Sequence, residues 1–210
     1  MMNIFLSGGP VMYPLLACSI ISLTVIIERS IFWFILNRCS NRQLLDEVMD
    51  LCESGDWEAV RRKTAGSKDP IVKILISGIL HRRYSMVKAM EASAADETKR
   101  MRRFMNVLDT MITVAPLLGI FGTVIGIIHS FDVLGTTGIE HPEFVTAGIA
   151  QALITTAAGL GIAILSVFPY NYFNSLVEDA AIHIEKYATS LEIVYEKLAQ
   201  KDLTIEGRQQ

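Results

Sequence analysis

Two long apolar segments, residues 107–134 and 144–173, carry polar side chains whose hydroxyl, amide and imidazole groups can bind water or a cation. These polar residues are Thr123, His129, Gln151, Thr155 and Thr156. At a helical rise of 1.5 Å per residue, both Thr123 and Thr156 lie near the middle of their segments, with His129 and Gln151 about two turns towards one side. A lone threonine in an apolar helix commonly bonds its own backbone, but the set together indicates a polar path or a lumen facing a partner.

Ionisable side chains are missing from the middle of every apolar segment. Asp109 and Asp132 lie at the two ends of 107–134, and the pair Glu28-Arg29 lies near one end of the first segment. Proton transfer across a membrane generally needs a titratable group at depth, and His129 is the only candidate, off centre. If protons cross, we expect the carboxylate to come from another polypeptide.

Small residues follow the same two segments at helical spacing. They are Pro116, Gly119, Gly122 and Gly126 in the first, and Gly148 and Gly159 in the second. Small residues let two membrane helices approach closely, and Gly122 and Gly126 form a GxxxG pair. These stripes could serve only to pack the two helices together, or could also line a path.

Three apolar runs are each long enough to cross roughly 30 Å of hydrocarbon, where a spanning segment must be helical to satisfy its backbone. The expected fold class is therefore all-α, an integral membrane protein with three transmembrane helices. We also expect long helices that extend into the cytosol, with residues 85–103 running on into the second span. The expected organisation is a periplasmic leader at 1–10, spans at 11–36, 107–134 and 144–173, a cytosolic helical domain at 37–106, a periplasmic loop at 135–143 and a cytosolic helical tail at 174–210.

The basic residues set the expected direction of the spans. Of the 19 Lys and Arg residues, all but Arg29 fall within 37–106 or 174–210, and none falls in the leader or in 135–143. The positive-inside rule therefore predicts an outside N-terminus and a cytosolic C-terminus. The same rule explains the basic clusters, so nucleic-acid binding is not expected.

Other functional classes find little support. Cys18, Cys39 and Cys52 have neither CxxC spacing nor neighbouring histidines, so free thiols are expected and no metal site. The sequence contains no nucleophile–base constellation and no phosphate-binding loop. We expect a protein that is not an enzyme and needs no cofactor.

The residues of the last two spans carry a family resemblance. The stretch A-P-L-L-G-I-F-G-T-V-I-G-I-I from Ala115, followed by G-I-A-Q-A-L-I-T-T-A-A-G-L-G-I-A-I-L-S-V-F-P-Y-N-Y-F from Gly148, resembles the two-helix signature of the MotA/TolQ/ExbB proton-channel family. The opening G-G-P-V-M-Y-P-L-L from Gly8 and the Glu28-Arg29 pair are similar to ExbB. Three spans with an outside N-terminus fit ExbB and TolQ, whereas flagellar MotA proteins have four.

The resemblance implies a ring of subunits, a pentamer in the family, whose second and third spans line a lumen. That lumen holds the single-span helices of a small ExbD- or TolR-like protein, which supplies a membrane aspartate. The family's lumen threonines match Thr123 and Thr156. Its third-span glutamate falls at Gln151, which cannot exchange a proton, so sodium coupling through oxygen ligands stays open beside proton coupling.

The expected function is that of the channel-forming subunit of an inner-membrane, ion-driven motor that energises a TonB- or TolA-like envelope protein. One alternative is a stator-like unit for gliding or flagellar-type motility. A second is a scaffold that conducts nothing, for which loss of the threonine hydroxyls would be harmless. A secondary transporter is disfavoured, because the chain has three spans and no inverted repeat.

Overall fold

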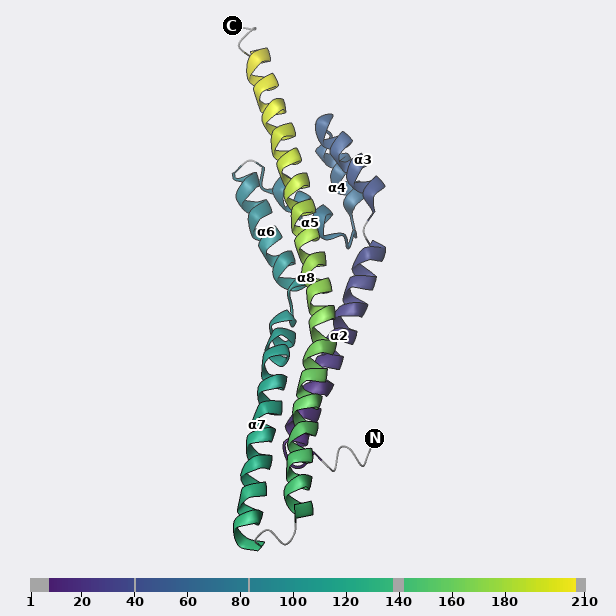
Figure 1. Cartoon of the computed structure of the whole chain (residues 1–210). Coiled ribbons are helices and arrows are strands. Elements are labelled where there is room, and N and C mark those ends of the chain that lie inside the picture. Colours follow the sequence, from purple (N-terminus) through teal and green to yellow (C-terminus); the bar gives the residue numbers. More distant parts are fainter. Residues whose placement is uncertain (1–7, 40, 83, 138–141, 207–210) are drawn as a thin grey trace. The chain divides into compact units, whose positions relative to one another are not determined.

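The structure is a computed structural model that describes residues 8–39, 41–82, 84–137 and 142–206, without the side chains of 136, 137, 142, 144 and 201–206. Within these ranges the chain is helical and contains no strand (Figure 1). The helices are α2 (Met12–Cys39), α3 (Arg42–Glu53), α4 (Trp57–Thr64), α5 (Pro70–Leu80), α6 (Met86–Met101), α7 (Met105–Thr137) and α8 (Pro142–Glu206). Three of them are long and apolar enough to cross a membrane, so the predicted all-α class with three spanning helices is confirmed.

The chain divides into two compact units, and α2 and α8 each contribute to both. The membrane unit comprises Met1–Ser30 and Phe104–Asn174, and the helical unit comprises Ile31–Arg103 and Ser175–Gln210. The predicted leader and outer loop lie largely outside the described residues, which begin at Gly8 and omit 138–141.

The core of the membrane unit lies where the first part of α2 meets α7 and α8. Its buried residues are Val11, Met12, Leu15, Cys18 and Ala115. Partly buried residues of α7 and of α8 pack against them, namely Met111, Val114, Leu118, Ile125, Ala158 and Ile162. Large apolar side chains cover the rest of the unit's surface, as expected for helices whose solvent is lipid.

The helical unit has a core of its own, formed by α3 to α6 and the last part of α8. Fully buried residues in it include Val48, Val72, Leu75, Val177 and Leu191. Capping residues start the short helices. The Asp69 carboxylate accepts the backbone N–H of Ile71 at 2.9 Å, with Pro70 in the first turn. Asn41 and Asp56 cap α3 and α4 in the same way.

The segment from Ser85 to Arg103 does not run on into the second span, so that prediction is wrong. Helix α6 ends at Met101, and α7 begins at Met105. Between them Phe104 has φ 64°, a left-handed conformation that a residue with a Cβ adopts at a cost. The sequence gives no signal of this break, because residues 102–104 include no Gly or Pro and helix-forming residues lie on both sides.

The buried thiol of Cys52 leads to a prediction about reactivity. Cys52 is 0% exposed, and burial raises the pKa of its thiol to about 12. Because only the thiolate is nucleophilic, we expect a maleimide at pH 8 to label the partly exposed Cys39 and to leave Cys52 unmodified in the folded protein. Mass spectrometry of the labelled peptides measures this. Equal labelling of both cysteines would contradict the buried position of Cys52.

The raised pKa of Cys52 also makes the free energy of unfolding depend on pH. Between the ordinary pKa of 9.0 and the folded-state value of about 12, the folded chain keeps a proton that the unfolded chain releases. The contribution of Cys52 to the free energy of unfolding is therefore complete below pH 9 and is lost as the pH rises towards 12. Comparison with Cys52→Ala separates this slope from that of other titrating groups.

Candidate ion path

Helices α7 and α8 of the membrane unit pack antiparallel through the small residues of both stripes. A Cβ built on Gly119 would lie 3.0 Å from Thr156 Cα, and one on Gly126 would lie 3.0 Å from the backbone oxygen of Gly148. A Cβ on Gly159 would collide with the backbone oxygen of Ala115. The two backbones therefore approach too closely for larger residues at these positions. Pro116 lies inside α7, beside this contact.

The three threonines make different hydrogen bonds. Thr155 is buried, and its hydroxyl donates to the backbone oxygen of Ala152 at 2.7 Å, with Gly119 oxygen at 3.5 Å. Thr156 donates across the helix pair to the oxygen of Gly119 at 3.0 Å. Thr123 donates within α7 to the oxygen of Ile120 at 2.6 Å. Each hydroxyl thus donates its hydrogen bond to a backbone carbonyl. The lone pairs of the hydroxyl oxygen are left to accept from water or to bind a cation.

Helix α2 covers one side of the α7–α8 pair, and the two partly exposed threonines lie on the other. The residues that pack against the α2 core include Leu118 and Ile125 of α7 and Ala158 of α8. At 100° per residue, Thr123 and Thr156 fall on the opposite flank of their helices from these residues. The membrane unit therefore presents both hydroxyls on an edge that α2 does not cover.

Gln151 lies on the α2 side instead. Its side-chain amide fills the space where Gly9 would carry a Cβ, and Gly9 has φ 69°. Any residue other than glycine at position 9 would meet both the amide and a strained backbone. The structure thus brings Gln151 to the turn before α2 and separates it from Thr123 and Thr156.

His129 is exposed on α7 and lies about one turn away from the level of Gln151. The register between α7 and α8 at this level is shown by Ser130, the next residue after His129. Its hydroxyl donates to the backbone oxygen of Val145 at 3.3 Å and faces Gly148. Within the described chain no hydrogen bond joins His129 to Gln151. Their expected common depth does not hold, because counting from span ends ignores the offset between the two helices.

Sequence reasoning did not single out Ser22 on α2, and it did not predict that Arg29 is buried. Ser22 is 4% exposed and Arg29 1% exposed, and both share a face with Leu15, seven residues apart each time. The Ser22 hydroxyl is buried without a hydrogen-bond partner among the described residues. The seven-residue spacing of Leu15, Ser22 and Arg29 is the signal that could have found this face.

Arg29 forms an ion pair with its neighbour Glu28. Its guanidinium donates to both carboxylate oxygens of Glu28, with N–O distances of 2.5 and 2.6 Å. The same group lies 5.8 Å from the centre of the Phe104 ring, at the break before α7. A bidentate pair beside an aromatic ring satisfies a charge that is otherwise expensive to bury.

Comparison with known proteins identifies the family to which the chain belongs. The family model described as the MotA/TolQ/ExbB proton channel family matches residues 67–186, which include α7 and much of α8. The chain is 32% identical to the ExbB-like biopolymer transport protein 3 of Synechocystis sp. over 91% of this chain and 93% of that protein. It is also 34% identical to ExbB-like protein 1 of the same organism, over 92% of this chain and 78% of that one.

A more distant relative is the Tol-Pal system protein TolQ of Haemophilus influenzae, 35% identical over 50% of this chain and 48% of that protein. The matched family is one of channels and transport subunits rather than enzymes. With three apolar helices in its structure, the chain is a multi-pass membrane protein that belongs to the MotA/TolQ/ExbB proton channel family.

Proposed function

We propose that this protein is the channel-forming subunit of an ion-driven motor in the bacterial inner membrane. The observation that carries the proposal is the uncovered edge of the α7–α8 pair, which presents Thr123 and Thr156 away from α2. Both hydroxyls are partly exposed and already donate to carbonyls, but their oxygens keep lone pairs, for which lipid offers no donor. The edge is therefore a suitable surface for a water-filled lumen or a polar partner helix.

The second support is the lack of a carboxylate in the middle of the described apolar helices. Within the described chain, the middle of each apolar helix holds no Asp, Glu, Lys or Arg, and Gln151 is turned towards Gly9. The proposed partner is a small single-span protein of the ExbD or TolR kind, which brings an aspartate into a lumen formed by a ring of these subunits. Five subunits are expected by analogy with the family. Its client would be a TonB- or TolA-like protein, with the N-terminus of the present chain periplasmic and its C-terminus cytosolic.

Ion flux in liposomes tests this proposal. The protein is reconstituted alone and with its small partner, under a proton gradient and separately under a sodium gradient. We expect flux only with the partner, and its loss when the partner's membrane aspartate becomes asparagine. Thr156→Val should also abolish most of the flux, because the isosteric side chain cannot hydrogen-bond. The gradient that supports flux identifies the ion.

Thr24→Val is the control, since Thr24 lies exposed on α2, away from the α7–α8 edge, and its hydroxyl donates to the backbone oxygen of Ile20. It should leave flux unchanged. Flux from this protein alone would overturn the borrowed-carboxylate mechanism. Normal coupling activity with Thr123→Val and Thr156→Val together would instead indicate the non-conducting scaffold.

A further inference from the structure

Ser22 of α2 carries a buried hydroxyl that finds no partner among the described residues. The residue is 4% exposed, and its oxygen is fully buried without a hydrogen bond. The other buried hydroxyls described in the membrane unit, those of Ser130, Thr155 and Ser166, each donate to a backbone oxygen. Because apolar side chains offer no acceptor, an unpaired hydroxyl inside this unit is costly and needs a physical explanation.

The helix could satisfy this hydroxyl by itself, but in the structure it does not. Serine and threonine in an apolar helix commonly donate to the carbonyl three or four residues earlier. Thr24 and Ser30 of α2 do so at 2.7 Å, to the oxygens of Ile20 and Ile26. Both of those residues are exposed, whereas Ser22 faces the interior of the unit. The partner of Ser22 must then lie between the helices.

A contact two turns away shows which residues surround Ser22. Helix α8 runs in the same direction as α2, and α7 runs in the opposite direction (Figure 1). Leu15 of α2 packs in one cluster with Ala115 of α7, and a Cβ on Gly159 of α8 would collide with the backbone oxygen of Ala115. Seven residues make nearly two full turns, about 10 Å, so a step of seven residues keeps to the same face of each helix.

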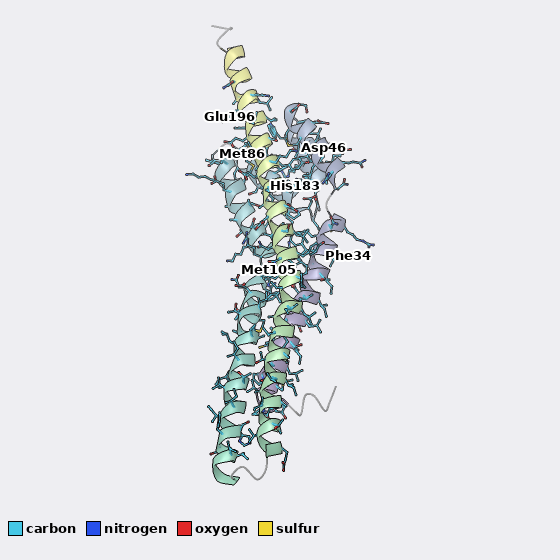
Figure 2. The ribbon with its side chains drawn as sticks, in the orientation of Figure 1. Phe34, Asp46, Met86, Met105, His183 and Glu196 are labelled. Carbon is cyan, nitrogen blue, oxygen red and sulfur yellow. The ribbon has the colours of Figure 1, made fainter. Side chains whose placement is uncertain are left out.

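That step leads to a layer of three buried residues. It reaches Ser22 on α2, Ser166 on α8 and, counted backwards along the chain, Leu108 on α7. Their exposed fractions are 4%, 1% and 0%. Met105, labelled in Figure 2 at the start of α7, is also buried three residues before Leu108, so this face of α7 stays covered here. Two of the three side chains in the layer are therefore small and polar.

The chemistry of this layer fits a single water molecule. The Ser166 hydroxyl donates to the backbone oxygen of Ile162 at 2.7 Å, so its oxygen is left to accept. The Ser22 hydroxyl has a hydrogen to donate, yet no hydrogen bond joins the two serines in the described chain. A water can accept from Ser22 and donate to Ser166, and the Cys18 carbonyl, one turn earlier on α2, keeps a lone pair for its second hydrogen. A metal cation would need a fuller shell of oxygen ligands.

We propose that a water molecule is bound between Ser22 and Ser166 and links α2 to α8 inside the membrane unit. Buried waters of this kind bond to polar groups that are otherwise unsatisfied, and they are costly to remove. The site lies on the α2 side of the α7–α8 pair, apart from the edge that presents Thr123 and Thr156. Its role is to hold α2 against that pair, and the inference does not depend on a ring or on ion coupling.

A crystal or cryo-electron microscopy structure of the full chain that resolves ordered water tests the site directly. We expect a density peak within roughly 3 Å of both hydroxyl oxygens, and its loss in Ser22→Ala. A map that shows other buried waters but no peak here overturns the proposal. Direct contact between the two serines would overturn it as well.

The direction of a stability change gives an independent measurement. If water bridges the serines, Ser22→Ala removes one of its partners and should lower the equilibrium constant for folding roughly tenfold. If Ser22 is simply unpaired, the same substitution removes a buried polar group and should raise that constant, which would contradict the bridge. Ser30→Ala is the matched control and should change the constant little, because Ser30 is exposed on the same helix and bonds its own backbone.

Ser166→Ala and the double variant complete this comparison. Since both serines bind the same water, the double variant should lose little more than either single variant, roughly tenfold and not roughly hundredfold. Losses that multiply would show that the two hydroxyls act separately, and the bridging water would then be rejected.

Discussion

Gly159→Ala is expected to lower the free energy of unfolding of this protein by about 1–3 kcal/mol, the range for overpacking a tight contact. The new methyl group would collide with the backbone oxygen of Ala115 and lie 3.1 Å from Gly119 Cα. Both neighbours are backbone, so relief requires α7 and α8 to move apart. Separation would also lengthen the hydrogen bond from Thr156 to Gly119. Titration of micelles with a denaturing detergent, followed by circular dichroism, measures the change.

Gly161 provides the matched control two residues along the same helix. A Cβ built there meets no atom within 4 Å. Gly161→Ala should therefore leave stability unchanged or raise it by up to about 1 kcal/mol, because alanine is the better helix former. Equal losses from the two substitutions would show that backbone flexibility, and not the close α7–α8 contact, accounts for the effect.

Glu28→Ala is expected to destabilise the protein by about 2–3 kcal/mol, somewhat below the loss for breaking a fully buried ion pair. The Arg29 side chain is 2% exposed and the Glu28 side chain 42% exposed. Removal of the carboxylate takes away two short hydrogen bonds from a guanidinium that cannot reach water. Because the remaining charge is buried, added salt should change the loss little. The same detergent titration at two ionic strengths measures it.

Glu47→Ala is the control, because Glu47 pairs with Lys63 on the surface of the helical unit, and both side chains are about half exposed. Surface pairs contribute about 0–1 kcal/mol, and salt screens them. If Glu28→Ala costs no more than Glu47→Ala, the Glu28 carboxylate is not the group that stabilises the buried Arg29 charge.

The sequence predicts the membrane helices well, because an apolar run long enough to cross the hydrocarbon must be helical there. It does not predict the break at Phe104, because no local sequence pattern indicates a left-handed φ at a residue with a Cβ. The stripes of Gly119, Gly126 and Gly159 identify which residues can come close, but not the register between two helices. That register separates His129 from the level of Gln151, and the turn at Gly9 draws Gln151 away from the threonines.

The helical unit cannot complete its core until the last part of α8 has been synthesised. Its core joins Val72 and Leu75 to Val177, Ile184 and Leu191, which lie on the far side of residues 104–174. At 5–20 residues per second, the ribosome needs roughly 4 to 14 s to make that intervening stretch. During that interval the apolar faces of α5 and α6 lack their final cover. A nascent chain is therefore vulnerable to proteases and dependent on chaperones until its last helix emerges, so truncation after the third span should lower the amount of protein far more than loss of the final residues.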